Sequence, residues 1–177
     1  MTEDAICKIA IVGPESTGKT TLTGQLAAHY GTNWVPEYAR EYLDSLKRDY
    51  RREDLRKIAE GQLHREDEKL RSANRYLFYD TNLVVLKIWQ EHKYGESDPW
   101  IDDQLRKRHY DLYLLSACDV PWEYDPQREN PHDRTVLFEK YQHVLEQMNV
   151  PYHVLEGGEE QRFNKAIQII SNLSLSL

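Results

Sequence analysis

The sequence is poor in cysteine: among its 177 residues only Cys7 and Cys118 occur. Two thiols that lie so far apart exclude a disulfide scaffold and a zinc knuckle, and we expect both to be chemically inert. The seven histidines have no spacing typical of a metal site, so we place them on the surface or in the core. A chain of this length buries enough apolar surface to fold as a single domain without either kind of crosslink.

Long apolar runs and a basic leader are absent as well. No stretch of about 18 apolar residues occurs, so we expect no membrane-spanning helix and no membrane partner. The first residues carry two acidic side chains and no basic segment, which is unlike a secretory signal. No internal repeat and no Gly/Ser-rich linker divides the chain. The sequence therefore predicts a cytoplasmic protein with one domain over residues 1–177.

Positive charge is in deficit. Lysine and arginine together number 23 against 30 aspartates and glutamates, which gives a formal net charge of −7. Broad binding of nucleic acid through a basic face is therefore not expected, although a local basic pocket remains open. Phenylalanine is scarce too, with 3 residues beside 4 tryptophans and 12 tyrosines. The aromatic side chains are thus mostly of the kind that combines a flat apolar face with a polar edge.

Short apolar runs alternate with longer amphipathic segments along the chain. The apolar runs predict strands, and the segments with helical spacing predict helices. We expect strands at 6–12, 33–35, 76–79, 110–115 and 152–155. We expect helices at 20–30, 37–46, 81–92, 100–108, 135–149 and 159–173, and helix with a solvated charged face within 47–75. This order is typical of an α/β fold with a parallel sheet covered by helices on both faces.

The first predicted strand runs into a glycine-rich loop that fits the phosphate-binding pattern G-x-x-x-x-G-K-[ST] at every fixed position. The nine residues expected to bind the nucleotide are Gly13, Pro14, Glu15, Ser16, Thr17, Gly18, Lys19, Thr20 and Thr21. The glycines let successive backbone N–H groups turn toward a polyphosphate, and the next helix adds its positive N-terminal end. Lys19 reaches the outer phosphates, and the Thr20 hydroxyl group is placed to bind Mg²⁺. The loop predicts a nucleotide but not a reaction.

Other motifs separate the reactions that such a loop serves. The base-reading motif N/T-K-x-D of GTPases has only a partial match at 164–167, and the chain lacks the length and signature loop of ABC-type ATPases. AAA-type motors carry two acids after the second core strand, and the second acid activates water. Here Asp80 is followed by Thr81. The missing acid favours transfer of a phosphoryl group to a bound acceptor over transfer to water.

Polar residues follow two of the predicted strands, at the edge where ligands bind in open α/β sheets. Glu37 and Arg40 come after the strand at 33–35, and Glu37 is a candidate base for an attacking hydroxyl group or simply a helix-terminal acid. Asp80 closes the strand at 76–79 and is a candidate Mg²⁺ ligand, a candidate base and a candidate helix N-cap. The residues leave open which of the two carboxylates takes the proton.

A polar loop at about 119–134 separates the fourth predicted strand from the next helix. It contains Arg128 and Arg134, and kinases use arginines of such a loop to neutralise charge on the transferring phosphoryl group. We therefore predict a short lid whose two arginines are catalytic candidates together with Lys19, Glu37 and Asp80.

Taken in order, these segments resemble the ribosylnicotinamide kinase domain of NadR-type proteins, within the P-loop nucleoside and nucleotide kinase superfamily. The similarity rests on GPESTGKTTL (13–22), WVPEYAREYL (34–43), DTN…KIWQEHKYG (80–95), DLYLL…DVPWEYDPQR (111–128) and VPYHVLEGG (150–158). It covers nearly the whole chain, and WVPEYAREYL is more specific than the phosphate loop. The resemblance implies a P-loop NTPase fold, that is, a three-layer α/β/α sandwich with a five-stranded parallel sheet and a short lid.

The resemblance also implies an activity: phosphorylation of the 5′-hydroxyl group of nicotinamide riboside by ATP with Mg²⁺, giving nicotinamide mononucleotide for NAD salvage. The pyridinium ring of that substrate is cationic, so aromatic faces and carboxylates would bind it by stacking and by charge. The candidates for this acceptor side are Trp34, Glu37, Tyr38, Arg40, Asn82, Asp119 and Trp122. Adenine is expected on the opposite side, near the Gly157-Gly158 turn and Arg162.

In one respect the chain departs from the longer members of this family, in which an adenylyltransferase domain often precedes the kinase domain. The chain has no H-x-G-H-type motif for that activity, so we expect a free-standing kinase or an excised kinase domain. Two alternatives stay open: a kinase for another nucleoside or nucleotide, and an ATP-binding switch without an acceptor. The sequence indicates neither the oligomeric state nor the preferred base of the phosphate donor.

Overall fold

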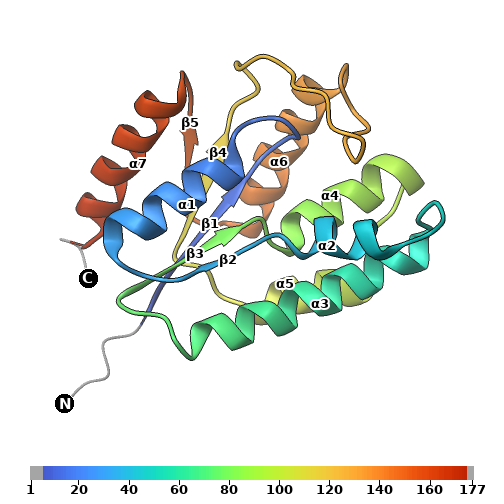
Figure 1. The fold of residues 1–177 in the computed structure, drawn as a ribbon, viewed down its shortest axis with the longest axis horizontal. Helices are drawn as coiled ribbons and strands as arrows, with labels where there is room; N and C mark the ends of the chain where they lie inside the picture. Colours follow the sequence, from blue (N-terminus) through green and yellow to red (C-terminus); the bar gives the residue numbers. More distant parts are fainter. Residues whose placement is uncertain (1–5, 175–177) are drawn as a thin grey trace.

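In the computed structural model, which describes residues 6–174, five parallel strands form one sheet between two layers of helices (Figure 1). The strand order is β2-β3-β1-β4-β5, and every neighbouring pair is parallel. The strands are β1 (Cys7–Val12), β2 (Trp34–Val35), β3 (Tyr76–Asp80), β4 (Leu112–Ser116) and β5 (Tyr152–Leu155). The predicted parallel sheet is confirmed, while the ends of the expected domain, 1–5 and 175–177, lie outside the described residues.

Helices connect the strands in the expected order. They are α1 (Lys19–Tyr30), α2 (Tyr38–Ser45), α3 (Arg52–Leu70), α4 (Leu83–Tyr94), α5 (Pro99–Lys107), α6 (Arg134–Met148) and α7 (Glu159–Ser174). The α4 helix begins two residues later than predicted, because the Asn82 side chain accepts the backbone N–H of Val84 and so acts as the N-cap. Within residues 6–174, no helix combines the length and the hydropathy needed to cross a bilayer.

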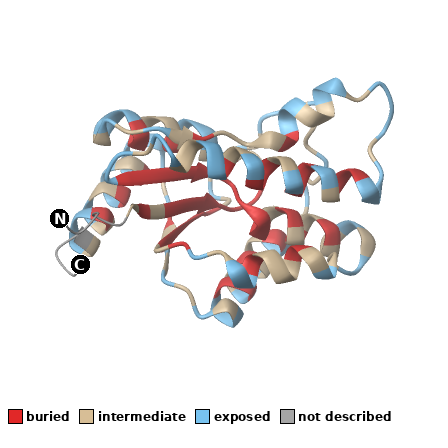
Figure 2. Ribbon diagram, turned by 90° about the horizontal axis from the view of Figure 1, so that it is seen from below, coloured by how far each residue is buried: buried red, intermediate tan, exposed pale blue. Residues whose placement is uncertain are grey.

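The sheet buries a separate apolar cluster on each of its faces. Alternate residues of the central strands point to opposite sides, so Ile9 and Ile11 pack toward α1 and α7. Ala10 and Val12 pack toward the other layer, which consists of α3, α4, α5 and α6. Figure 2 shows the strands buried between helices that each keep an exposed side. This arrangement is the three-layer α/β/α sandwich that the sequence predicts.

The charged stretch at 47–75 folds largely as α3, whose apolar side packs on the sheet as its spacing predicts. The expected solvated face is present, and its exposed residues are Arg52, Glu53, Lys57, Glu60, His64, Asp67 and Glu68. Three polar residues nevertheless lie on the packed side of the helix and are buried, namely Asp54, Gln62 and Glu66. Asp54 is stabilised in its buried position by Arg48, whose Nη1 donates at 2.7 Å, and by the backbone N–H of Arg51, also at 2.7 Å. These donors meet the hydrogen-bonding requirement of the buried Asp54 carboxylate.

The strand order brings the carboxyl ends of β1 and β3 together at one edge of the sheet. Ile11 of β1 lies opposite Asp80 of β3 in the register. The phosphate loop, residues 13–20, leaves β1 at this edge, and the lid, which we define as the connection 117–133 between β4 and α6, starts at the same edge (Figure 1). Ligands of open α/β sheets bind at such an edge.

Candidate active site

A cavity of about 450 Å³ opens at the carboxyl edge of the sheet. Its walls come from the phosphate loop, the residues around the start of α2, the end of β3, the helices α4 and α6, and the lid. Four of the predicted site residues outside the glycine-rich run line it together with Lys19 of that run, namely Glu37, Arg40, Asp80 and Arg128. The cavity thus joins a half at the phosphate loop to a second half walled by helices.

The phosphate loop has the backbone that its glycines were expected to allow. Gly13 has a φ of +139°, and a Cβ atom there would lie 2.6 Å from the carbonyl oxygen of Ser116. Gly18 has a φ of 76° and precedes α1 without a side-chain cap, so the N–H groups at the helix start are available to a phosphate. Lys19 Nζ donates to the carbonyl oxygen of Pro14 at 2.7 Å, which holds the ammonium group within the loop.

Charge is concentrated around the Lys19 ammonium group. Burial lowers the pKa of Lys19, and the carboxylates of Glu37, Asp80 and Glu15 oppose that shift. A polyphosphate bound in the loop would add further negative charge beside the ammonium group. Its presence would therefore favour the protonated form of Lys19, which is the form that binds phosphate.

Asp80 ends β3 and lines the cavity beside the phosphate loop. Thr20 Oγ1 donates to Asp80 Oδ2 at 2.7 Å, while Asp80 Oδ1 is buried without a hydrogen-bond partner among the described residues. Burial raises the pKa of Asp80 above its usual range. A free carboxylate oxygen beside a threonine hydroxyl group fits Mg²⁺, which usually takes one or two protein oxygens together with phosphate and water oxygens.

This Mg²⁺ site depends on oxygens that a nucleotide would bring. In the part of the chain from 6 to 174, no three His, Cys, Asp or Glu side chains are grouped so that they could hold a metal ion by themselves. The alternative role predicted for Asp80, capping of the following helix, belongs instead to Asn82.

Glu37 lies at the N-cap position of α2 and faces the cavity. Its side chain makes no capping hydrogen bond in the structure described, although a helix-terminal role was one reading of the sequence. Burial and the carboxylate of Asp80 raise the pKa of Glu37 to about 7, against the opposing effects of Lys19 and Arg40. A carboxyl group with this pKa is partly ionised at neutral pH, as a group that accepts a proton must be.

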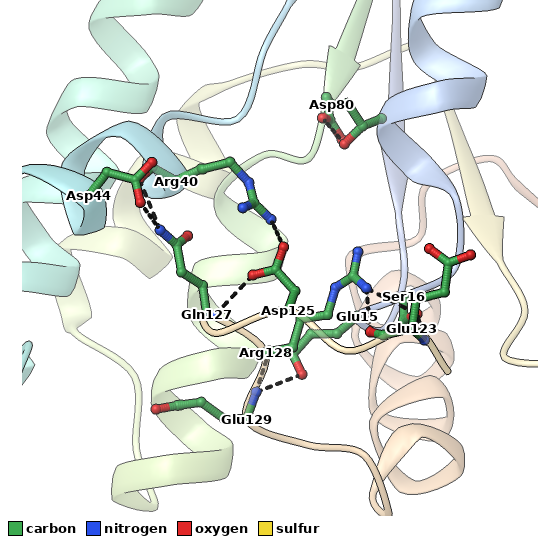
Figure 3. A network of polar contacts seen from close by, with 11 residues as sticks. Glu15, Ser16, Arg40, Asp44, Asp80, Glu123, Asp125, Gln127, Arg128 and Glu129 are labelled. Carbon is green, nitrogen blue, oxygen red and sulfur yellow. Dashed lines mark hydrogen bonds and ion pairs between the residues drawn. The ribbon is translucent and has the colours of Figure 1, made fainter. Parts of the chain in front are cut away.

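The lid is attached to the phosphate loop by several hydrogen bonds (Figure 3). The Glu15 carboxylate accepts the backbone N–H groups of Glu129 at 3.1 Å and of Asn130 at 3.0 Å. Arg128 Nη1 donates to Ser16 Oγ at 3.3 Å, which holds the guanidinium group beside the loop. The predicted lid segment therefore lies over the phosphate-binding half of the cavity.

A second set of contacts joins the lid to α2 (Figure 3). Arg40 Nη2 donates to Asp125 Oδ2 at 2.9 Å, and Gln127 Nε2 donates to Asp44 Oδ1 at 2.6 Å. Arg40 thus connects the helix that follows Glu37 to the lid.

Arg134 and Trp122, both predicted as site residues, contact each other outside the cavity. Arg134 begins α6, and its Nη1 donates to the backbone carbonyl oxygen of Ser16 at 3.2 Å. Its guanidinium carbon lies 5.7 Å from the centroid of the Trp122 ring. Arg134 is therefore attached to the backbone of the phosphate loop, whereas Arg128 lines the cavity itself.

Two aromatic residues predicted for the acceptor side also lie away from the cavity. Trp34 packs against the apolar cluster under α1 and α7, because its position in β2 directs it to that face of the sheet. The Tyr38 ring packs on α3, where a Cβ atom added at Gly61 would fall 2.1 Å from it, and the Arg65 guanidinium group lies 4.8 Å from its centroid. Both rings contribute to packing in this structure.

Two polar residues predicted for the acceptor side are engaged elsewhere. Asn82 caps α4, and its Nδ2 donates to the Tyr113 hydroxyl group at 3.1 Å. Asp119 forms an ion pair with Arg162 and accepts the backbone N–H of Gly157 at 2.7 Å. These hydrogen bonds keep both side chains outside the cavity.

Arg162 lines the cavity on the side where adenine is expected. Its guanidinium group donates to the carbonyl oxygens of Thr17 at 2.8 Å, Ala117 at 3.0 Å and Gly157 at 2.7 Å. Arg162 thus ties the turn after β5 to the phosphate loop and to the end of β4. Its proximity to adenine stays a prediction.

Sequence reasoning did not select the helical wall of the second half. That wall consists of Leu43, Val85, Ile88, Trp89, His92, Leu137 and Tyr141. Tyr141 is buried, with one side at the cavity. A signal was present in α4, where the four wall residues recur at the spacing i, i+3, i+4 and i+7 shortly after Asp80, on one face of a helix.

A family model described as an AAA domain matches residues 8–162. Two curated proteins, each named "Trifunctional NAD biosynthesis/regulator protein NadR", come from Salmonella typhimurium (strain LT2) and Escherichia coli (strain K12). Each is 28% identical over 174 residues, which covers 93% of this chain and 42% of the relative. The chain therefore spans less than half the length of these relatives.

Solved structures show the same fold. A crystal structure of NadR protein in complex with NR has a TM-score of 0.84 and 22% identity, covering 95% of this chain and 51% of that one. A crystal structure of NadR protein in complex with NAD and AMP-PNP has a TM-score of 0.78 and 20% identity, covering 95% and 49%. At these identities the likeness establishes the fold, and the predicted P-loop kinase fold is confirmed.

Proposed function

The chain belongs to the AAA domain family, and on that premise we propose that it transfers the γ-phosphoryl group of ATP to the 5′-hydroxyl group of nicotinamide riboside, giving nicotinamide mononucleotide. One observation carries the proposal: a single cavity joins a complete phosphate loop to a pocket with a carboxylate and aromatic walls. The curated relatives, which are named for NAD biosynthesis, support it. Thr81 follows Asp80 where AAA-type motors have their water-activating acid, which favours an acceptor other than water.

The second half of the cavity, walled by α4 and α6 and here called the acceptor half, suits a flat cationic ring. Trp89 and Tyr141 supply aromatic surface there, and Glu37 supplies negative charge. Cation–π attraction and the carboxylate would both favour a pyridinium ring over a neutral base. Arg40 is paired with Asp125, which offsets its repulsion of a cation at this end.

The half at the phosphate loop fits the triphosphate of ATP with Mg²⁺. Thr20 and Asp80 would hold the ion through the threonine hydroxyl group and the free oxygen Oδ1, and the bound ion supplies charge that neutralises the outer phosphates. Lys19 binds the same phosphates once its hydrogen bond to the Pro14 carbonyl oxygen has broken. Arg128 adds a positive charge from the lid.

In the transfer step, the 5′-oxygen bonds to the γ-phosphorus, and the bond from that phosphorus to the bridging oxygen breaks, which releases ADP. The Glu37 carboxylate accepts the hydroxyl proton, because it lines the acceptor half and has a pKa near 7. Asp80 is less suited to this role, since its Oδ2 already accepts from Thr20 and its Oδ1 would hold the Mg²⁺ ion. Lys19 and Arg128 stabilise charge on the transferring group.

An acceptor panel tests the proposal. The purified protein is incubated with ATP and Mg²⁺ and with nicotinamide riboside, uridine, thymidine or nucleoside monophosphates, and product formation is measured. We expect the highest kcat/KM for nicotinamide riboside and no transfer by Lys19→Ala. Preference for another acceptor would overturn the substrate and leave the kinase class standing. ATP hydrolysis that is independent of every acceptor would instead favour an ATP-binding switch.

A further inference from the structure

Trp89 is a cavity residue with an aromatic ring that contacts a side chain outside the cavity. Its indole Nε1 donates to the Tyr50 hydroxyl oxygen at 3.0 Å. The two rings also meet edge to face, with their centroids 5.1 Å apart. Tyr50 lies in the segment between α2 and α3, so this segment fixes the plane of an aromatic ring in the acceptor half.

The Tyr50 hydroxyl group also reaches the lid. It donates to Glu129 Oε2 at 2.5 Å, and Lys93 of α4 contacts both the Tyr50 oxygen and Glu129 Oε1, the latter at 3.0 Å. The direction of these bonds is set by chemistry, because an indole N–H can only donate. The Tyr50 oxygen must therefore accept from Trp89, which leaves its single O–H for Glu129.

Glu129 is attached to the phosphate loop through its backbone. Its N–H donates to the Glu15 carboxylate at 3.1 Å, so the same residue contacts the phosphate loop with its main chain and Tyr50 with its side chain. A continuous path of hydrogen bonds thus runs from Glu15 through Glu129 and Tyr50 to Trp89.

We propose that Tyr50 and Glu129 are positioning residues that couple the two halves of the cavity. When the lid is attached to the phosphate loop, Glu129 holds Tyr50, and Tyr50 holds the Trp89 ring in the orientation that binds the acceptor. A nucleotide in the loop favours the attached lid, because Arg128 can then contact both the loop and the phosphates. Nucleotide and acceptor consequently strengthen each other's binding by the same factor. This inference rests on the proposed function, since it places the acceptor against Trp89.

The test measures that factor directly. The Kd of nicotinamide riboside is determined by calorimetry with and without a non-hydrolysable ATP analogue and Mg²⁺, and the ratio of the two values is the coupling factor. We expect a factor of at least about 5 for the unmodified protein. Tyr50→Phe keeps the ring contact but removes the hydroxyl group, so we expect the factor to fall below about 2 while the Kd without nucleotide changes little.

Two further variants sharpen the test. Glu129→Ala keeps the backbone contact with Glu15 and removes the carboxylate, so it should lower the coupling factor as Tyr50→Phe does, and the double variant should lower it no further. Tyr152→Phe is the matched control, because the Tyr152 hydroxyl group also donates to a glutamate, Glu146, at 3.1 Å but far from the lid. Its coupling factor should equal that of the unmodified protein.

The outcomes separate this inference from the proposed function. A coupling factor near 1 in the unmodified protein, or an unchanged factor in Tyr50→Phe, would overturn the inferred coupling. A merely structural role for Tyr50 would weaken both Kd values equally and leave their ratio intact, which would overturn it as well. If nicotinamide riboside is not phosphorylated, the proposed substrate fails, and the factor is measured with the acceptor that the panel identifies. If the panel identifies no acceptor, both proposals fail.

Discussion

At the scale of single residues, the two carboxylates of the cavity differ in what surrounds them. Asp80 accepts a hydrogen bond from Thr20 and keeps one buried oxygen free, whereas Glu37 makes no capping bond and has a pKa raised to about 7. Two acids with such different surroundings usually have different roles in catalysis. The sequence left the choice of base open, and these contacts support Glu37 as the base and Asp80 as the Mg²⁺ ligand.

The pH dependence of the rate tests the role of Glu37. The base must be ionised, so we expect kcat/KM to rise about tenfold per pH unit below 7 and to level off above it. The rates are measured at limiting concentrations of both substrates, where the free enzyme governs the profile. Glu37→Gln should lower kcat by about 100- to 10,000-fold and remove the rising limb. A variant that keeps the same inflection would assign the titration to another group.

The charge of Asp80 is tested by Asp80→Asn. Asparagine can still accept from the Thr20 hydroxyl group, but it lacks the charge that binds Mg²⁺. We expect kcat to fall by roughly 100-fold and the required Mg²⁺ concentration to rise, with a smaller change in the Kd for ATP. Steady-state kinetics over a Mg²⁺ series provides the measurement. An Asp80→Asn enzyme with unchanged kcat would remove this residue from the mechanism.

At the scale of elements, the position of α2 depends on its close packing against α3. Gly61 of α3 has no room for a Cβ atom, which would lie 2.1 Å from the Tyr38 ring. We expect Gly61→Ala to destabilise the fold by about 1–3 kcal/mol in urea denaturation and to reduce activity, because α2 positions Glu37 and Arg40.

A matched control is available in α1. Gly24 has nothing within 4 Å of an added Cβ atom, so Gly24→Ala should stabilise the protein by about 0.5–1 kcal/mol. Equal stability of Gly61→Ala and Gly24→Ala would show that the Tyr38 ring moves aside without cost.

The elements were more predictable from sequence than the contacts between them. The strands and the phosphate loop carry local signals, such as the apolar run of β1 ending at Gly13. The acceptor wall has a weaker signal. The spacing of its four α4 residues marks one face of that helix, but whether this face meets the cavity depends on the cap at Asn82 and on the neighbours of β3 in the sheet. The bond from Glu15 to Asn130 joins residues 115 positions apart, and no local pattern predicts such a contact.

At the scale of the whole molecule, one buried acid links the stability of the fold to pH. Glu66 of α3 is 2% exposed; Tyr110 donates to its Oε2 at 2.7 Å, and Oε1 has no hydrogen-bond partner within the described residues. Burial raises the pKa of Glu66 from its ordinary value of 4.5 to about 7. The folded state therefore binds the Glu66 proton more tightly than the unfolded state does. The stability that this difference contributes is complete below pH 4.5 and is lost as the pH rises through 7. It amounts to about 3 kcal/mol at most.

Substitution of Glu66 by glutamine tests this linkage. The free energy of unfolding of Glu66→Gln, minus that of the unmodified protein, should increase by up to about 3 kcal/mol between pH 4.5 and pH 8, because glutamine does not ionise and the variant therefore keeps the stability that the unmodified protein loses. Urea denaturation at several pH values measures the difference. The control is Glu160→Gln, at an exposed position of α7, whose difference should stay constant. A constant difference for Glu66→Gln as well would contradict the linkage.

The central place of β1 in the sheet has a consequence for the order in which the molecule is made. Ile9 of β1 pairs with Phe78 and with Leu112, residues that a ribosome adds long after it. Gly13 of the phosphate loop also packs closely against Ser116 of β4. The phosphate loop is thus synthesised before β4, the strand against which Gly13 packs. Such pairing between distant segments slows folding and leaves β1 without both of its sheet neighbours until β4 has been synthesised.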